Sequence, residues 1–364
     1  MAACDSGAIF DRMRPRAGET PALRGGGIPA RTHVRETIAW DTSLAYTPKM
    51  TAKNSALNRR EFCAATIAGT TAFMSSARGA ALDSKPFTDF QLACMTLPYR
   101  QFPLARALTG IKSAGYDFVA WGTSHQESAG GKPVPVMATD APIGKARELG
   151  NRCRDAGLKP LMMFSTVYPE HKDGLAVLTH RLKQAAAGEV PQVLTFGHTK
   201  GGNRDLWIER FKRLGPIARD LGVLLVVKQH GGETGTGEAC AEIVREVNDP
   251  GVRVNYDAGN VMDYLNVNPL PDIRTCADVV HSFCMKDHRN WPKDQDCGPG
   301  WGEIDHYRLL HAVAWTGRTM PLCCENIFEP LVSRPTTAEG VDRVARRVRE
   351  FLESVIAGLK VAGK

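Results

Sequence analysis

The sequence lacks several features that would assign a protein to a class at once. It has no uninterrupted apolar run of the ~20 residues that a membrane-spanning helix needs, so no lasting transmembrane segment is expected. No cysteine pair has the short spacing of a structural zinc site, since Cys323 and Cys324 are adjacent and would point to opposite faces of a strand. No glycine-rich segment ends in Gly-Lys-Ser or Gly-Lys-Thr, so a nucleotide-binding P-loop is excluded.

Excess positive charge is also missing from most of the chain. The formal net charge is +7 over 364 residues, but residues 1–81 alone contain 11 Lys and Arg against 6 Asp and Glu. The rest of the chain is close to neutral, so we expect no nucleic-acid partner. A composition of 43% hydrophobic and 23% charged residues is ordinary for a globular protein. Its length suits one large domain of ~250–300 residues plus extensions.

Residues 50–81 have the layout of an export signal. Arg59 and Arg60 form a twin-arginine pair, an uncharged stretch runs from Phe62 to Met74, and the small residues 79–81 suit a signal peptidase. The uncharged stretch is about half the ~20 residues that span a bilayer. We therefore expect use of the twin-arginine export machinery and a periplasmic or extracellular location. Because Met50 offers an alternative start, residues 1–49 are expected to be an over-called extension or disordered.

From residue 87 onward, short apolar runs alternate with helical patterns. The predicted strands are Phe90–Thr96, Asp117–Trp121, Lys159–Ser165, Gln192–Gly197, Val223–Gln229, Arg253–Asp257, Val279–Lys286 and Pro321–Glu325. The predicted helices are Pro103–Ala114, Ala141–Ala156, Gly174–Ala187, Arg204–Leu221, Glu238–Asn248, Leu270–Ala277, Ile304–Trp315 and Thr337–Leu359. Eight such units over residues 87–360 predict a single α/β domain, a (β/α)8 or TIM barrel. The rival, a doubly wound open sheet, rarely shows eight evenly spaced units.

Four of the eight cysteines outside the leader lie in apolar runs that read as buried strands, where cysteine behaves as a small hydrophobe. Such residues are Cys94, Cys284, Cys323 and Cys324. We therefore expect no structural disulfide, although an exported protein could form one.

Polar side chains stand at or just after the ends of five consecutive predicted strands. They are His198, Lys228 with His230, Asp257 with Asn260, Lys286 with Asp287, and Glu325. In a (β/α)8 barrel the carboxyl ends of the strands surround the active site. Ionisable groups gathered there cost free energy unless they are paired, so a purely structural barrel gains nothing from them. The sequence therefore predicts a functional site at this end.

The order of motifs resembles the second half of the xylose isomerase-like sugar phosphate isomerase/epimerase superfamily. The motifs are Asp257-Ala258-Gly259-Asn260, a strand ending in Lys286-Asp287, Gly300-Trp301-Gly302-Glu303-Ile304-Asp305, and a strand ending in Glu325. The resemblance covers about residues 87–360 and identifies the chain as a divergent member. That superfamily includes sugar epimerases, inosose dehydratases and a branch of DNA-repair endonucleases.

The resemblance implies a divalent metal held by Glu, Asp, His and Glu from strands five to eight. Asp257 and Glu325 match two of these positions, whereas Lys228 and Cys284 stand at the other two. Two arrangements stay open. In one, the Lys228 ammonium replaces the metal between the carboxylates, because an ammonium cannot ligate. In the other, Mn, Mg or Zn is held by His230, Asp257 and Glu325, with His288 or Cys284 as a further ligand.

We therefore expect a sugar, keto-sugar or cyclitol isomerase, epimerase or lyase that abstracts a proton next to a carbonyl. Glu325 is the expected base, Lys228 or a metal would hold the enolate-like oxygen, and Lys228 or His230 would return or relay the proton. The expected contacts to a small carbohydrate substrate are His198, Asn260, Lys286, Asp287 and Trp301. The loop 288–303 is a candidate lid.

Each of these residues also has a structural interpretation. His198 and His230 could bond loop carbonyls, Lys286 and Asp287 could form a rim ion pair, and Asn260 could be a turn residue. A non-catalytic carbohydrate-binding barrel that has lost its metal site is the alternative function. A nuclease-type phosphodiesterase is disfavoured, since the chain lacks the His/Glu/Asp-rich shell that several metals need. The sequence leaves the oligomeric state open.

Overall fold

The computed structural model describes residues 85–165 and 167–362. The predicted extension at 1–49 and the predicted export signal at 50–81 lie outside the described residues, so both stay predictions. None of the described helices is both long enough and apolar enough to cross a membrane.

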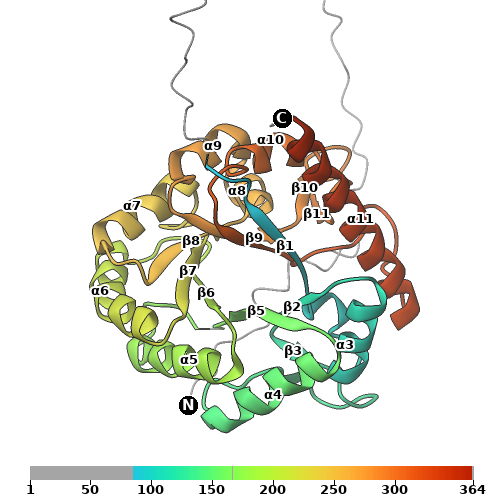
Figure 1. Cartoon of the computed structure of the whole chain (residues 1–364), viewed down its shortest axis with the longest axis horizontal. Helices are drawn as coiled ribbons and strands as arrows, with labels where there is room; N and C mark the ends of the chain where they lie inside the picture. The colour runs from blue at the N-terminus through green and yellow to red at the C-terminus, as the bar shows by residue number, and fades with distance from the viewer. Residues whose placement is uncertain (1–84, 166, 363–364) are drawn as a thin grey trace, which may run out of the picture. The chain divides into compact units, whose positions relative to one another are not determined.

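Eight parallel strands close into a barrel in the order β1-β12-β9-β8-β7-β6-β5-β2 (Figure 1). Their bounds are β1 Asp89–Met95, β2 Phe118–Trp121, β5 Lys159–Phe164, β6 Gln192–Phe196, β7 Leu224–Lys228, β8 Val252–Tyr256, β9 Val280–Met285 and β12 Thr319–Cys324. The first strand closes the ring, because β1 pairs with β12 on one side and with β2 on the other. The predicted (β/α)8 barrel is thereby confirmed.

Helices surround the strands and bury their apolar faces against the barrel (Figure 1). The outer helices are α3 Leu104–Ser113, α4 Ile143–Asp155, α5 Gly174–Gly188, α6 Arg204–Asp220, α7 Gly237–Val247, α9 Pro269–Cys276, α10 His306–His311 and α11 Ala338–Ala362. Three of the predicted helix ends are confirmed by glycines with positive φ, at Gly115 (93°), Gly157 (75°) and Gly222 (67°). Glycine suits these positions because it adopts this backbone conformation without a Cβ clash.

Several connecting elements differ from the prediction. A short helix, α8 Ala258–Leu265, begins directly after Asp257, whose carboxylate accepts a hydrogen bond from the Asn260 N–H. The predicted lid loop contains a two-stranded hairpin, β10 Asp287–Arg289 and β11 Gln295–Cys297. The helix predicted over 304–315 is shorter and covers only α10. A second hairpin, β3 Ser124–His125 and β4 Val134–Pro135, and a 3₁₀ turn, η2 Leu97–Tyr99, complete the described elements.

The core contains the cysteines as apolar side chains. All eight cysteines among the described residues are buried and free, in agreement with the expectation of no disulfide. Trp121, the last residue of β2, is fully buried. Its ring lies so close to Gly188 of α5 that a Cβ there would approach it to 2.6 Å. Trp121 therefore fastens the outer helices to the barrel and does not face a ligand.

Candidate active site

The carboxyl ends of β7, β8 and β12 bring a lysine and two carboxylates together. Lys228 is the last residue of β7, and its Nζ lies 2.7 Å from Glu325 Oε2 and 3.0 Å from Asp257 Oδ2. Asp257 directly follows β8 and Glu325 directly follows β12. Parallel strands of a barrel place these positions at one end, which is why residues far apart in sequence form a single ion cluster.

Two opposing effects set the protonation of Lys228. Its side chain is 3% exposed, and its Nζ lies 5.4 Å from the Phe164 ring and 5.8 Å from the Phe196 ring. Burial by itself lowers the pKa of Lys228, but the charges of Glu325 and Asp257 outweigh it and raise that pKa above its ordinary value. Lys228 is therefore a fixed cation at neutral pH, which disfavours its expected use as a proton relay.

The two carboxylates differ in exposure and in pKa. The side chain of Glu325 is 15% exposed and that of Asp257 is 0% exposed. Burial raises the pKa of Asp257, and Lys286 and Lys228 offset only part of that rise. Burial acts on Glu325 too, but Lys228 and Lys286 more than compensate and lower its pKa. Glu325 is thus the ionised carboxylate that a small molecule in the mouth can reach.

A second lysine, Lys286, extends the cluster from the end of β9. Its Nζ lies 3.0 Å from Asp296 Oδ2 and 3.9 Å from Asp257 Oδ2. Its aliphatic stem crosses the first turn of α8, where a Cβ on Gly259 would lie only 2.6 Å from Lys286 Cγ. The glycine of the Asp-x-Gly-Asn motif is therefore required because Lys286 packs against its backbone.

Asn260, an expected substrate contact, is buried behind this lysine. Its side-chain oxygen accepts a hydrogen bond from Lys286 Nζ, and its Nδ2 donates to the Gln229 carbonyl at 2.7 Å. Its exposed fraction is only 1%. Because its amide is already used on both sides, the geometry gives Asn260 a positioning role between β7 and Lys286.

Asp296 belongs to the site and was missed in the sequence. It lies in β11, accepts a hydrogen bond from Lys286 at 3.0 Å, and pairs with His288 Nδ1 at 3.1 Å. Burial by itself raises the pKa of Asp296, but Lys286 and His288 lower it to about 2. No motif pointed to Asp296, because it reaches Lys286 only through the unpredicted hairpin.

Asp287, another expected substrate contact, uses both carboxylate oxygens inside its own loop. Oδ1 accepts from the backbone N–H groups of His288 at 2.8 Å and Ile304 at 3.1 Å, and Oδ2 accepts from that of Gly300 at 3.1 Å. A Cβ on Gly302 would collide with the same carboxylate. The Lys-Asp and Gly-x-Gly motifs therefore fold into one loop, and the geometry does not favour substrate contact at Asp287.

His230 lies beside the cluster as a neutral ring. Its Nδ1 is 2.7 Å from the Gly197 carbonyl, and since a carbonyl only accepts, Nδ1 bears the hydrogen. Burial and the charge of Lys228 lower the pKa of His230 to about 4. It therefore has no imidazolium proton to donate at neutral pH. Its ring packs between those of Phe196, at 4.7 Å, and Tyr264, at 5.2 Å.

Aromatic rings line the side of the mouth formed by β5, β6 and β7. Phe164 packs 6.0 Å from Phe196, and Tyr168 lies edge-on to Phe196 at 5.8 Å. His198, which is exposed, stacks on Tyr168 at 3.9 Å. We call Phe164, Tyr168, Phe196, His198 and His230 the aromatic wall. Phe164 and Phe196 were missed because rings in apolar runs read as core. Tyr168 was missed because it lies between β5 and α5, where no motif marks it.

Trp301 is not part of this wall. The Arg347 guanidinium of α11 lies 4.9 Å from the Trp301 ring. That contact associates Trp301 with the outer helix, so stacking of a ligand on this ring stays a prediction without support from the contacts.

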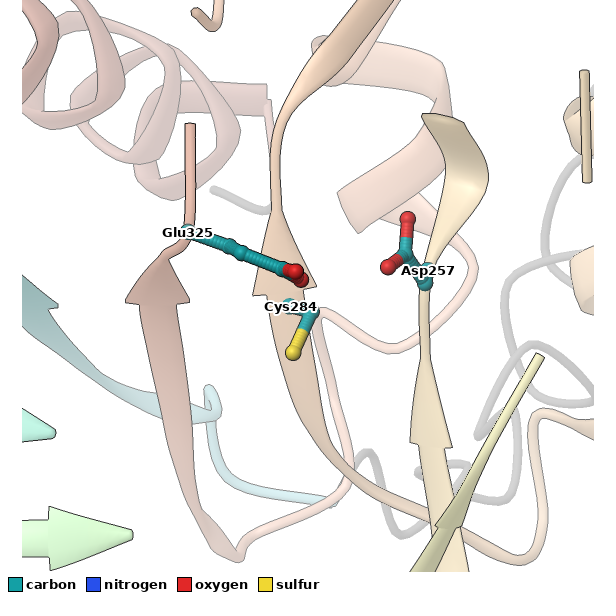
Figure 2. Close-up of side chains that lie close together, drawn as sticks. All are labelled: Asp257, Cys284 and Glu325. Carbon is teal, nitrogen blue, oxygen red and sulfur yellow. The ribbon is translucent and has the colours of Figure 1, made fainter. Parts of the chain in front are cut away.

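The resemblance to the superfamily implies a divalent metal at the centre of the barrel mouth, but the residues found there do not fit one. Asp257, Cys284 and Glu325 each offer a ligand atom, all within 4.8 Å of one another (Figure 2). The Lys228 ammonium, however, already lies against both carboxylates and cannot ligate. Burial raises the pKa of the Cys284 thiol, which disfavours the thiolate that a metal binds. His230 is not among the described residues whose ligand atoms gather in this group.

Comparison with known proteins agrees with this architecture. No curated protein matches the sequence. Among solved structures, a magnesium complex of a xylose isomerase-like TIM barrel protein from Mycobacterium smegmatis has a TM-score of 0.57 at 16% identity, over 73% of this chain and 97% of that one. A D-psicose 3-epimerase crystallised in the presence of D-fructose has a TM-score of 0.54 at 14% identity, over 73% and 99%.

A third structure is a fusion of a xylose isomerase-like TIM barrel with 4-hydroxyphenylpyruvate dioxygenase. It has a TM-score of 0.56 at 17% identity, over 74% of this chain but only 43% of that chain. These likenesses establish the fold. A family model described as xylose isomerase-like TIM barrel matches residues 108–352, which is more than half of the sequence. The chain therefore belongs to the xylose isomerase-like TIM barrel family.

Proposed function

We propose that this protein is a sugar, keto-sugar or cyclitol isomerase, epimerase or lyase in which a lysine ammonium does the electrostatic work of a metal. One observation carries the proposal. The reachable Glu325 carboxylate is paired at 2.7 Å with the buried ammonium of Lys228. A base and an oxyanion-stabilising cation thus lie side by side at the end of the barrel where such enzymes act.

The proposed step starts with removal of a proton from a carbon next to a carbonyl. Glu325 takes the proton, the C–H electron pair moves into the carbon skeleton, and negative charge develops on the carbonyl oxygen. Protonated Glu325 no longer neutralises Lys228, so the ammonium can donate a hydrogen bond to that oxygen as its charge appears. Asp257 stays against Lys228 at 3.0 Å and keeps it in place.

The positions of the acid and base groups favour some of these reaction types over others. Glu325 can return the proton on the face from which it came, either to the neighbouring carbon or to a leaving hydroxyl. Inversion at one carbon needs a donor on the opposite face. Asp257 is fully enclosed, and His230, whose pKa is about 4, is neutral. Isomerisation or elimination therefore fits these residues better than epimerisation.

The aromatic wall supports a carbohydrate as the substrate, because rings of this kind stack on the apolar faces of sugars. Relatives by fold include a protein named as a D-psicose 3-epimerase, which agrees with the same class of substrate. A non-catalytic carbohydrate-binding barrel would use the same wall but would not need Glu325 as an accessible base.

Exchange of substrate hydrogen with solvent separates these functions. We expect the full chain in D2O to incorporate deuterium next to the carbonyl of at least one member of a panel of aldoses, ketoses and cyclitol ketones, measured by mass spectrometry. Glu325→Gln should slow this exchange ~10²–10⁴-fold, the usual contribution of a positioned general base. Glu329→Gln, at an exposed position of the segment that follows β12, is the matched control and should exchange at the wild-type rate.

Two other outcomes of the exchange experiment would contradict the proposed function. A wild-type protein that binds a sugar without any exchange would be the binding barrel. Exchange that persists in Glu325→Gln would show that another group is the base.

A further inference from the structure

A second group of metal-binding side chains lies beside the ion cluster and is not explained by the proposed reaction. Asp263 of α8, His288 of β10 and Asp294, between β10 and β11, each offer a ligand atom, and these atoms lie within 4.8 Å of one another. Ligands bound at ~2.1 Å to one ion can be at most ~4.2 Å apart. The side chain of Asp294 is 73% exposed, so it can shift towards the other two ligand atoms to meet that limit.

His288 presents a buried ring nitrogen to this group of side chains. The side chain is 1% exposed, and Nε2 has no hydrogen-bond partner among the described residues. The Asp294 carboxylate approaches Nε2 to 3.4 Å, which is longer than an ordinary hydrogen bond. A buried polar atom without a partner costs free energy, so its place in a native site calls for an ion or another partner.

The other nitrogen of the same ring is oriented as in metal-bound histidines. His288 Nδ1 lies 3.1 Å from Asp296 Oδ1, and a carboxylate accepts the Nδ1 hydrogen. Asp296 is itself anchored by Lys286 at 3.0 Å. Histidine ligands almost always donate the second ring N–H to a carboxylate in this way, which leaves the lone pair of Nε2 directed at the metal.

The local charge also favours a cation. Asp263, Asp294 and Asp296 surround His288, and of these Asp296 is the one paired with a lysine. The part of the chain that the structure describes provides no ion pair or hydrogen bond to the Asp263 side chain.

We propose that Asp263, His288 and Asp294 bind one divalent transition cation, Mn²⁺ or Zn²⁺, which fastens the β10–β11 hairpin to α8. One imidazole and two carboxylates suit these ions and leave positions for water. The site differs from the family's strand-end position, since none of its three ligands belongs to the Asp257–Lys228–Glu325 cluster. It does not depend on the proposed carbohydrate chemistry.

Mn²⁺ titration of the full chain tests the proposal. Mn²⁺ is the probe because it prefers oxygen and nitrogen ligands to the thiols of this cysteine-rich chain. After removal of bound metal with a chelator, free Mn²⁺ is counted by electron paramagnetic resonance. We expect one strong site per chain. Asp294→Asn and Asp263→Asn should each weaken it at least ~10-fold, since even loss of an outer partner of a ligand costs 10–100-fold.

Two controls make the outcomes distinct. Asp220→Asn removes an aspartate that is 73% exposed, the same fraction as for Asp294, and should leave Mn²⁺ affinity unchanged. Glu325→Gln should also keep the site. Loss of binding in Glu325→Gln with retention in Asp294→Asn would place the ion at the centre and overturn the proposal. Absence of a stoichiometric site, or unchanged affinity in both aspartate variants, would overturn it as well.

Discussion

The two sides of the barrel mouth are built from different chemistry. The side formed by the ends of β5, β6 and β7 presents the aromatic wall, in which His230 is neutral and Phe164 packs against Phe196. The side formed by β8, β9 and β12 presents buried carboxylates and Lys286. Lys228 lies between them, with its stem near two phenylalanine rings and its ammonium on two carboxylates. The aromatic side is suited to bind the apolar face of a sugar, and the charged side is suited to proton transfer.

The charged side should be the more important for stability, and removal of Lys228 tests this most strongly. Lys228→Met removes the cation between the Asp257 and Glu325 carboxylates, and loss of one partner from a buried ion pair typically costs 3–5 kcal/mol. Urea unfolding of the variant and of wild type at pH 7 measures the loss. Lys212→Met, at an exposed position of α6, is the control and should change stability by less than ~0.5 kcal/mol. A loss below ~1 kcal/mol at Lys228 would mean that the cluster is solvated.

Asp296 gives the charged side a distinctive pH dependence. Its pKa is lowered from 3.8 to about 2 in the folded protein, so its contribution is complete above pH 4 and disappears as pH falls towards 2. A shift of this size corresponds to about 2 kcal/mol. We expect the pH-dependent part of the stability difference between wild type and Asp296→Asn to reach that value at pH 7 and to vanish near pH 2. Urea unfolding at several pH values would show a constant difference if the pairing were absent.

Substitutions on the aromatic side should change ligand affinity far more than they change the protonation of the ion cluster. Tyr168→Leu keeps an apolar side chain but removes a ring, and such ring contacts are worth ~0.5–1.5 kcal/mol. For a sugar that undergoes exchange, we expect affinity to fall ~2–12-fold in a titration, with the pH dependence of unfolding unchanged. Tyr307→Leu, on the outer helix α10, is the matched control. Equal losses in both variants would remove the distinction between the two sides.

The sequence predicted the fold well because parallel barrel strands are covered on both faces. Their continuous apolar runs, the helices between them and the glycines at helix ends are local signals, and the strands appeared within a few residues of the expected bounds. It also located Lys228, Asp257 and Glu325, since each stands where a strand ends. The sequence also predicted substrate contact at Asn260 and Asp287, whereas their polar atoms bond to other groups of the protein. A motif does not tell whether a carboxylate or amide will face a ligand or bond to its own loop.

The features that escaped prediction depend on contacts between distant segments. Asp296 joins the site through a hairpin whose strands are three residues long, too short for a periodic pattern. Phe164 and Phe196 belong to apolar runs that look the same whether a ring faces the core or the mouth. The pKa of about 4 for His230 arises from enclosure and from Lys228 on a neighbouring position, and neither the pKa nor its cause can be obtained from composition.

The sequence by itself determined that the chain forms eight strand–helix units and that ionisable groups stand at five consecutive strand ends, because both follow from periodicity and order along the chain. Only the tertiary structure decided which of those groups meet. Closure of the barrel places Lys228 against Asp257 and Glu325, so that an ammonium occupies the centre where the family's arrangement would lead one to expect a metal. The physical reason is that Coulombic pairing and burial act through space, over distances that sequence separation does not specify.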